Sequence, residues 1–235
     1  MFTQGIPRLS EGILVGRTGY LKKEERRDMR KIFIVALSVF IVFIGVTRVY
    51  ALGLGPYIEL GSGSGDLDDD YSTYNVDTSS TGFGFVLDTS PRDSKVFNYR
   101  LNVGYEKHDI EFPAGGTIEL DGLSIDNTFG FSVVRKKNVR FWLGPQIRLA
   151  YYTGSSGNMD YSLAAFGIGP VLGVNFPMGP VATISLSGGF RLMGYAGTRD
   201  YDYYNYYDDD SYDNNTDFTV SGGMGFFNVS VLFGR

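Results

Sequence analysis

The chain has 235 residues, with 21 lysines and arginines, 26 acidic residues, one histidine and no cysteine. The lack of cysteine excludes a disulfide framework, a thiolate nucleophile, a Cys-ligated metal centre and a lipid-modified N-terminal Cys. A single histidine excludes His-pair and His-triplet metal sites, and we expect no metal site and no cofactor. The 32 glycines and the aromatic content of 15% are typical of a chain rich in strands and turns.

The N-terminal part of the chain carries an export signal. A basic start, Met-Arg-Lys, precedes a predominantly apolar run at 32–46, and Ala51 occupies the last position of a cleavage site. We predict a signal peptide at residues 29–51 and interpret residues 1–28 as an extension that results from a start codon placed too far upstream. A membrane-spanning helix is the alternative, but it needs about 20 apolar residues and Arg48 ends this run sooner.

Loss of residues 1–51 makes the chain strongly acidic. This segment contains nine basic and four acidic residues, so 12 basic and 22 acidic residues remain, a net charge of about −10. Nucleic-acid binding needs a cationic face that neutralises phosphates, and we therefore expect no nucleic-acid partner.

Apolar and polar residues alternate by twos through much of residues 52–235, which predicts β-strands. The alternation is clearest at 96–106 and 139–152. Six further segments follow the same pattern, at 52–61, 81–88, 123–134, 164–176, 182–195 and 218–233. Short connections, at 89–95, 135–138 and 177–180, alternate with long ones at 62–80, 107–121, 153–163 and 196–217. This pattern predicts an all-β fold, an eight-stranded antiparallel up-and-down transmembrane β-barrel at 52–235.

Charged side chains fall on the less apolar face of the predicted strands. A cation that faces the middle of a bilayer costs roughly 2–4 kcal/mol, so this face must line the lumen while the other meets outer-membrane lipid. Eight strands enclose room for side chains only, and we predict that the charges interlock as a buried ion-pair plug. A gated ion path through the same charges is the alternative. The predicted lumen set is Glu59, Arg100, Glu106, Asp126, Arg140, Arg148 and Arg191.

A soluble, lipocalin-like barrel is the competing fold, with its apolar face turned inward around a ligand. The charges on the opposite face argue against it, because the exterior of a soluble barrel should be densely polar. Here that face is instead rich in small residues such as Gly82, Gly84 and Gly130.

The last predicted strand carries Phe227, Val229, Val231 and Phe233 at alternate positions. Together with the eight segments, it resembles the small eight-stranded outer-membrane barrels typified by the OmpA transmembrane domain and OmpX, over essentially all of residues 52–235. The resemblance implies localisation in the bacterial outer membrane and a C-terminal signal that is read by the outer-membrane assembly machinery. In that family the last residue is usually aromatic, whereas Gly234 and Arg235 follow Phe233 here.

The long connections are acidic and the short turns are basic. If both termini are periplasmic, the acidic loops face outside, where they either remain solvated or share divalent cations with anionic surface glycolipid. Their acidic residues are Asp66, Asp68, Asp69, Asp70, Asp77, Asp109, Glu111, Asp160, Asp200, Asp202, Asp208, Asp209, Asp210, Asp213 and Asp217. The spacing completes no EF-hand loop.

Tyrosines are interleaved with Asp and Asn in the last long connection. This composition is typical of adaptable recognition surfaces, and low-complexity disorder is the alternative. The candidates for recognition are Tyr201, Tyr203, Tyr204, Tyr206, Tyr207 and Tyr212. They favour a surface-interaction role, in adhesion or ligand contact.

His108, followed by Asp109, is the sole candidate for acid–base catalysis. Outer-membrane proteases and lipid A-modifying enzymes place such a histidine near the rim, but no motif supports that function here, and a polar loop residue is the simpler interpretation. We expect a structural or surface-interaction protein without enzymatic activity. The alternatives are a lipid A-modifying or proteolytic outer-membrane enzyme and a narrow channel.

Overall fold

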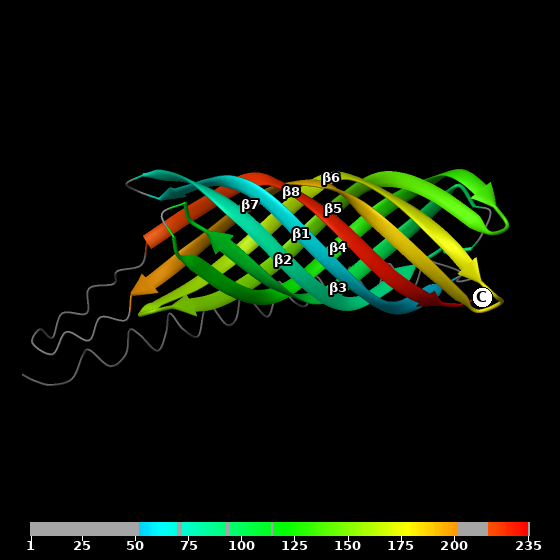
Figure 1. Cartoon of the computed structure of the whole chain (residues 1–235), viewed down its shortest axis with the longest axis horizontal. Helices are drawn as coiled ribbons and strands as arrows, with labels where there is room; N and C mark the ends of the chain where they lie inside the picture. Colours follow the sequence, from blue (N-terminus) through cyan, green and yellow to red (C-terminus); the bar gives the residue numbers. More distant parts are fainter. Residues whose placement is uncertain (1–51, 70–71, 93–94, 114, 202–215, 235) are drawn as a thin grey trace, which may run out of the picture. The chain divides into compact units, whose positions relative to one another are not determined.

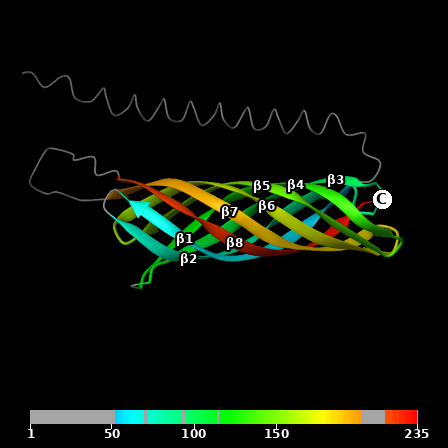
Figure 2. The same ribbon diagram turned by 90° about the horizontal axis from the view of Figure 1, so that it is seen from above.

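Eight antiparallel strands form one closed barrel in a computed structural model that describes residues 52–69, 72–92, 95–113, 115–201 and 216–234 (Figures 1 and 2). Each strand pairs with its neighbours in the sequence, and β1 pairs with β8 to close the ring. The strands are β1 (Gly53–Asp69), β2 (Thr73–Asp88), β3 (Phe97–Glu111), β4 (Thr117–Lys136), β5 (Val139–Ser156), β6 (Met159–Met178), β7 (Ala182–Tyr201) and β8 (Thr216–Phe233). The predicted eight-stranded up-and-down barrel is confirmed.

The predicted signal peptide at 29–51, its cleavage site at Ala51 and the extension at 1–28 lie outside the described residues. Among the residues that the structure does describe, no helix is long and apolar enough to cross a membrane.

Tight turns connect strands at both ends of the barrel. At the end where β8 finishes, which we call the turn end, Lys137 and Asn138 join β4 to β5. There, too, Gly179 has a φ of +66°, which glycine adopts without steric cost, in the turn between β6 and β7. At the opposite end, the mouth end, β5 and β6 are joined only by Gly157 and Asn158.

Every strand extends further toward the mouth end than the sequence alternation predicted. β1 continues from residue 61 to Asp69, and β7 continues from residue 195 to Tyr201. Most of the described residues that were expected in long loops therefore belong to strands. The cause is an inversion of the alternation: toward the mouth end the outward positions become polar and the inward positions become apolar, so the lipid-facing pattern stops while the backbone pairing goes on.

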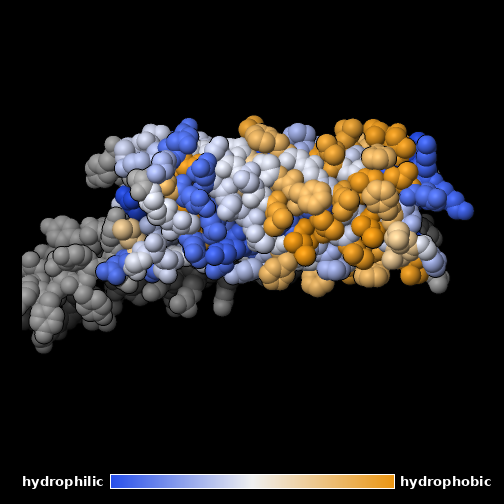
Figure 3. Space-filling view, in the orientation of Figure 1, coloured by the Kyte–Doolittle hydropathy of each residue, from blue (hydrophilic) through white to orange (hydrophobic). Residues whose placement is uncertain are grey.

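Exposed apolar side chains lie on all eight strands in the half nearer the turn end and together form a belt around it. Figure 3 shows them gathered in that half on one face of the barrel. Leu123, for example, exposes 64% of its surface and Phe83 exposes 61%. Exposed apolar side chains in a closed ring are expected where the solvent is lipid. The belt defines the membrane-spanning segments, which are residues 54–60, 83–87, 97–105, 123–134, 139–151, 164–178, 182–192 and 227–233.

The barrel projects well beyond this belt at its mouth end. The last exposed apolar side chain of β1 is Leu60, and the strand continues for nine more residues, from Gly61 to Asp69. At ~3.3 Å per residue and a strand tilt of ~40°, these residues extend the wall about 20 Å past the belt. Their outward side chains are Ser62, Ser64, Asp66 and Asp68, so this part of the wall is suited to water.

The interior is divided in the opposite sense from the exterior. Within the belt, the inward side chains are mainly polar or charged, with Glu59, Arg100 and Arg148 among the buried ones. Beyond the belt, an apolar cluster fills the barrel, and Ile110, Leu120 and Leu163 are fully buried in it. The barrel thus has a polar core where lipid surrounds it and an apolar core where water surrounds it.

Candidate functional site

Five charged side chains from five strands meet in the lumen at the mouth-side edge of the belt. Nη1 of Arg148 lies 2.9 Å from Oε1 of Glu59 and 3.3 Å from Oδ1 of Asp126, and Arg148 also pairs with Glu106. Nη1 of Arg191 lies 2.8 Å from the same Glu59 oxygen. We call these five residues the central charge network. Because all of them are buried, each charge depends on its neighbours for the solvation that water would otherwise provide.

The other two residues of the predicted lumen set, Arg100 and Arg140, also lie inside the barrel but outside the central charge network. Arg100 donates to the hydroxyl oxygens of Ser185 at 2.6 Å and of Ser230 at 2.5 Å. Arg140 donates from Nε to the hydroxyl of Ser132 at 2.5 Å. The seven charges therefore share one interior, with hydroxyl and amide oxygens completing the shells of two of them.

The connection between β2 and β3 folds over the turn end of the lumen. Pro91 is buried there, and its carbonyl oxygen accepts a hydrogen bond from the side-chain amide of Asn175 at 3.0 Å. Arg92 reaches across to β7, where its Nε donates to the hydroxyl of Thr183 at 2.9 Å. This connection therefore caps the barrel below the central charge network.

The inward glycines do not leave an open path, although the sequence allowed one. A Cβ placed on Gly104 would collide with the hydroxyl of Tyr57, and one on Gly173 would collide with the ring of Trp142. The space that these glycines release is occupied by large aromatic side chains from other strands, both of which are buried. Small lumen residues here make room for large ones rather than for water.

His108 lies inside the barrel, and its interpretation as a polar loop residue was wrong. It is 0% exposed on β3, beyond the belt, with ring centroids 5.1 Å from Tyr152 and 5.2 Å from Tyr195. Neither ring nitrogen has a hydrogen-bond partner among the described residues. Burial lowers the pKa of His108 to about 4. The imidazole is therefore neutral at physiological pH and is packed as an aromatic ring.

The acidic residues expected in loops are placed differently by the structure. Asp66, Asp68, Asp69, Asp77, Asp109, Glu111, Asp160, Asp200 and Asp217 belong to the mouth-end parts of the strands. Asp70, Asp202, Asp208, Asp209, Asp210 and Asp213 lie outside the described residues, as do Tyr203, Tyr204, Tyr206, Tyr207 and Tyr212, while Tyr201 ends β7. Within the described ranges, no three acidic or histidine side chains are grouped closely enough to hold a metal ion.

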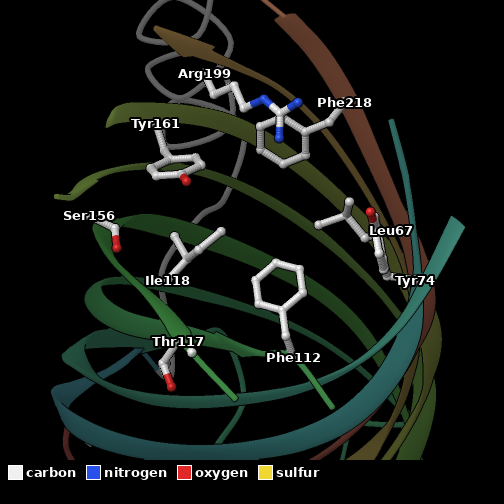
Figure 4. Close-up of a pocket in the computed structure, with 10 residues that line it drawn as sticks. Leu67, Tyr74, Phe112, Thr117, Ile118, Ser156, Tyr161, Arg199 and Phe218 are labelled. Atoms are coloured by element: carbon white, nitrogen blue, oxygen red, sulfur yellow. The ribbon is translucent and has the colours of Figure 1, made fainter. Parts of the chain in front are cut away.

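A pocket of about 310 Å³ opens at the mouth end, above the apolar core (Figure 4). Its deep wall consists of the buried side chains Leu67, Ile118 and Phe218. Nearer the rim, Tyr74 packs edge-to-face on Phe112, with ring centroids 6.4 Å apart. The lining is completed by Gly116, Thr117, Ser156, Tyr161 and Arg199. We call this feature the mouth pocket.

The mouth pocket was not predicted from the sequence, although the alternation at 117–121 contains a signal for it. In 117–121, Ile118 and Leu120 alternate with Thr117, Glu119 and Asp121, which is period two with apolar residues on the inward positions. A template that requires lipid-facing apolar residues does not extend to this inverted pattern. Tracing the alternation through its change of phase would have found the deep wall of the pocket.

The four alternating residues of the last strand lie on the outer surface of β8. Phe227 and Phe233 are exposed at the belt, as is Val229, and Val231 is half-buried on the same face. They therefore face lipid in the folded barrel. Three tyrosines also lie on the outer face: Tyr105 and Tyr151 are exposed, and the half-buried Tyr99 donates its hydroxyl to Asn127 at 2.6 Å.

No family model matches the chain, and no curated protein matches its sequence. Among solved structures, it is similar to the outer membrane protein OprG from Pseudomonas aeruginosa, with a TM-score of 0.58 and 10% identity over 79% of this chain and 95% of that one. A major outer membrane protein from Thermus thermophilus has a TM-score of 0.40, with 11% identity over 77% of this chain and 99% of that one. Neisserial surface protein A has a TM-score of 0.32, with 13% identity over 72% of this chain and 95% of that one.

The likeness to OprG shows the fold, and the two lower TM-scores add nothing to it. Together with the closed sheet and its apolar belt, this fold identifies an outer-membrane β-barrel, located in the bacterial outer membrane. The narrower resemblance to the OmpA transmembrane domain and OmpX stays a prediction.

Proposed function

We propose that this outer-membrane barrel is sealed at the level of the membrane, has no catalytic activity and acts by surface interaction at its mouth end. The observation that carries the proposal is the central charge network: three carboxylates and two guanidinium groups fill the lumen at the mouth-side edge of the lipid belt. If the lumen of this eight-stranded barrel were an open pore, water would hydrate these charges. Instead, all five are buried.

Two further layers support a sealed barrel. On one side, Pro91 and Arg92 cap the turn end. On the other side, the apolar core that contains Ile110, Leu120 and Leu163 lies between the central charge network and the mouth. An ion that entered from the mouth would lose its hydration in this apolar layer without gaining ligands, which opposes the narrow-channel alternative.

The surroundings of His108 support a non-catalytic role. A general base needs a substrate or a nucleophile within hydrogen-bond reach, and a catalytic histidine is usually oriented by a second polar group. His108 is fully buried between Tyr152 and Tyr195, and its nitrogens have no such partner among the described residues. The enzyme alternative therefore lacks its expected arrangement.

The mouth end is suited to recognition because it stands about 20 Å beyond the belt. An even number of strands leaves both ends of the barrel sequence on the same side of the membrane. In outer-membrane barrels that side is the periplasm, so the mouth end faces the cell exterior. The acidic strand ends and the Tyr-rich connection between β7 and β8 are the proposed contacts, with anionic glycolipid, bridged by divalent cations, as one partner. The outward side chains of β8 are proposed to guide recognition by the assembly machinery.

Planar-bilayer recording with the purified protein tests the seal. We expect no steady conductance from the wild-type barrel, and a measurable leak when Arg148→Ala removes the side chain that joins Glu59, Glu106 and Asp126. Arg148→Lys, which keeps the charge, should leak less. Steady conductance of the wild type would overturn the sealed barrel and favour the channel.

Surface interaction is tested with intact cells. Replacing residues 203–214 by a short Gly-Ser linker should lower retention of purified surface glycolipid or host matrix, while the heat-dependent gel mobility of the barrel is kept. Equal retention by both proteins, at equal surface amounts, would contradict a recognition role for this connection. A change in lipid A composition or in surface proteolysis on His108→Ala would revive the enzyme alternative.

A further inference from the structure

A β-bulge interrupts β4 at the edge of the belt nearer the turn end. Ser132 pairs with Trp142 and Val134 pairs with Phe141, so Val133 is an extra residue on β4. One extra residue reverses the phase of a strand, because successive side chains point to opposite faces. Val133 and Val134 are therefore both on the outside, where they expose 62% and 36% of their surfaces.

The bulge places Lys136 on the outer face of the barrel. Opposite residues of an antiparallel pair share a face. Lys136 pairs with Val139, which lies two residues from the lipid-facing Phe141 on the same face of β5. Without the extra residue, Lys136 would have the inward parity of Ser132. Lys136 and the next residue, Lys137, are both exposed.

The two lysines stand at the depth of lipid headgroups. Lys136 lies two residues beyond Val134, the last exposed apolar residue of β4. At ~3.3 Å per residue and a strand tilt of ~40°, this is about 5 Å past the belt. The polar layer of a bilayer extends about 5–7 Å beyond the hydrocarbon on each side. The side chain of Lys136 therefore reaches the layer that contains the lipid phosphates, and Lys137 follows directly beyond it.

The turn end is basic. The sequence at 89–96, 135–138, 179–181 and 234–235 contains six basic residues and one acidic residue, Asp93. Figure 3 shows hydrophilic side chains directly beyond the apolar belt at this end. A cluster of cations beside a membrane attracts anionic headgroups, and each Lys or Arg near the surface contributes to that attraction.

Apolar side chains of the neighbouring strands continue the site into the belt. Phe141 on β5 exposes 45% of its surface and Phe176 on β6 exposes 37%. Within the described ranges, the side chains of Lys136 and Lys137 form no ion pair. The site thus offers two positive charges at headgroup depth above an apolar surface, which matches a molecule with an anionic head and acyl chains.

We propose that the turn between β4 and β5 binds an anionic glycerophospholipid of the periplasmic leaflet, with its phosphate on Lys136 and Lys137 and its acyl chains along Phe141 and Phe176. The partner is a phospholipid because the turn end faces the periplasm, where the outer membrane presents its phospholipid leaflet. The site lies at the end opposite the mouth and goes beyond the surface interaction proposed there.

The test uses the barrel purified from outer membranes into a mild non-ionic detergent. The protein is titrated with cardiolipin, phosphatidylglycerol or phosphatidylcholine, and native mass spectrometry counts the lipids that stay bound. Each cation near a membrane surface strengthens anionic binding by a factor of about five. Cardiolipin and phosphatidylglycerol should therefore bind about 25-fold more tightly than phosphatidylcholine.

Substitution of the two lysines locates the site. Lys136→Gln and Lys137→Gln should each weaken cardiolipin binding about fivefold, and the double variant about 25-fold, with phosphatidylcholine binding unchanged. Lys107→Gln, an equal change on the outer wall at the mouth end, should leave all three affinities unchanged. Deleting Val133 returns Lys136 to the inward parity and should act as Lys136→Gln does. The two glutamine variants leave the sheet intact, so they decide the case even where the deletion prevents folding.

Equal affinities for phosphatidylcholine and the anionic lipids, or full cardiolipin affinity in the double variant, would overturn the proposal. An equal loss in Lys107→Gln would show that net charge alone sets the binding, and would overturn the site. Glycerol 3-phosphate has the charge without the acyl chains, and it should not displace cardiolipin at equal concentration. Displacement would identify free phosphate, and not a lipid, as the ligand.

Discussion

Replacing Arg148 by methionine should destabilise the barrel severely. Arg148 contacts three buried carboxylates, and Glu106 has no other ion pair among the described residues, whereas Glu59 and Asp126 keep Arg191. Breaking a buried pair on one side typically costs about 3–5 kcal/mol. Arg148→Met leaves Glu106 without an ion pair and removes one of the two ion pairs of Glu59 and of Asp126. We therefore expect it to lower the free energy of unfolding by about 4 kcal/mol.

Urea titration in lipid vesicles measures this loss. The chain has a single tryptophan, Trp142, which is buried in the barrel, so its fluorescence reports folding without added labels. For an m-value of about 2 kcal/mol/M, the midpoint should fall by about 2 M. Lys137→Met, at the exposed turn between β4 and β5, is the matched control and should stay within about 0.5 kcal/mol of the wild type.

A second substitution identifies the source of the loss. If the unpaired carboxylate of Glu106 causes the loss of stability, Arg148→Met combined with Glu106→Leu should recover roughly half of that loss. This corresponds to a coupling energy of about 2 kcal/mol. A loss below about 1 kcal/mol for Arg148→Met, or no recovery in the double variant, would refute the reasoning that the central charge network is dry and mutually dependent.

Three further outcomes are expected from the same titration and from gel mobility. Gly173→Leu, which collides with the ring of Trp142, should cost about 1–3 kcal/mol, while Gly194→Leu, with nothing within 4 Å of its Cβ position, should cost little. Because burial lowers the pKa of His108 to about 4, the unfolded chain takes up a proton first as the pH falls from about 6.5, so stability is lost toward pH 4. Between about pH 7 and about pH 4.5, the wild type should lose about 2 kcal/mol more than His108→Phe. Replacing residues 203–214 by a linker should leave the barrel folded, because β7 ends at Tyr201 and β8 begins at Thr216; a variant that fails to insert would place these residues in the sheet.

The sequence predicted the strands correctly where lipid surrounds the barrel, because the alternation that was sought has apolar residues at the outward positions. In β3, residues 97–105 alternate lipid-facing and lumen-facing side chains, and the predicted strand and the inward position of Arg100 both follow from that period. The ion pairs depend on the stagger between strands, which brings Glu59 of β1 against Arg191 of β7. The period-two alternation of one sequence shows which face a side chain is on, but not how far neighbouring strands are shifted along one another.

The mouth-end parts of the strands were missed for a physical reason. In residues 107–111, Lys107, Asp109 and Glu111 face outward while His108 and Ile110 face inward. The alternation continues there, but its polarity is reversed because water replaces lipid outside the barrel. The same reversal concealed the burial of His108, and it is the reason that the mouth pocket was not anticipated.

The change of phase along the strands is the central claim, and cysteine labelling tests it most directly. The natural chain has no cysteine, so single-cysteine variants react at one position only. With a membrane-impermeant maleimide on intact cells, we predict that Ser64→Cys and Thr219→Cys, beyond the belt, are labelled, and that Leu123→Cys and Leu143→Cys, within it, are not. Lys137→Cys, at the turn end, should be labelled only after the cells are lysed. Protection of Ser64→Cys and Thr219→Cys in both intact and lysed cells, with labelling of Leu123→Cys, would contradict a barrel whose mouth half stands outside the membrane.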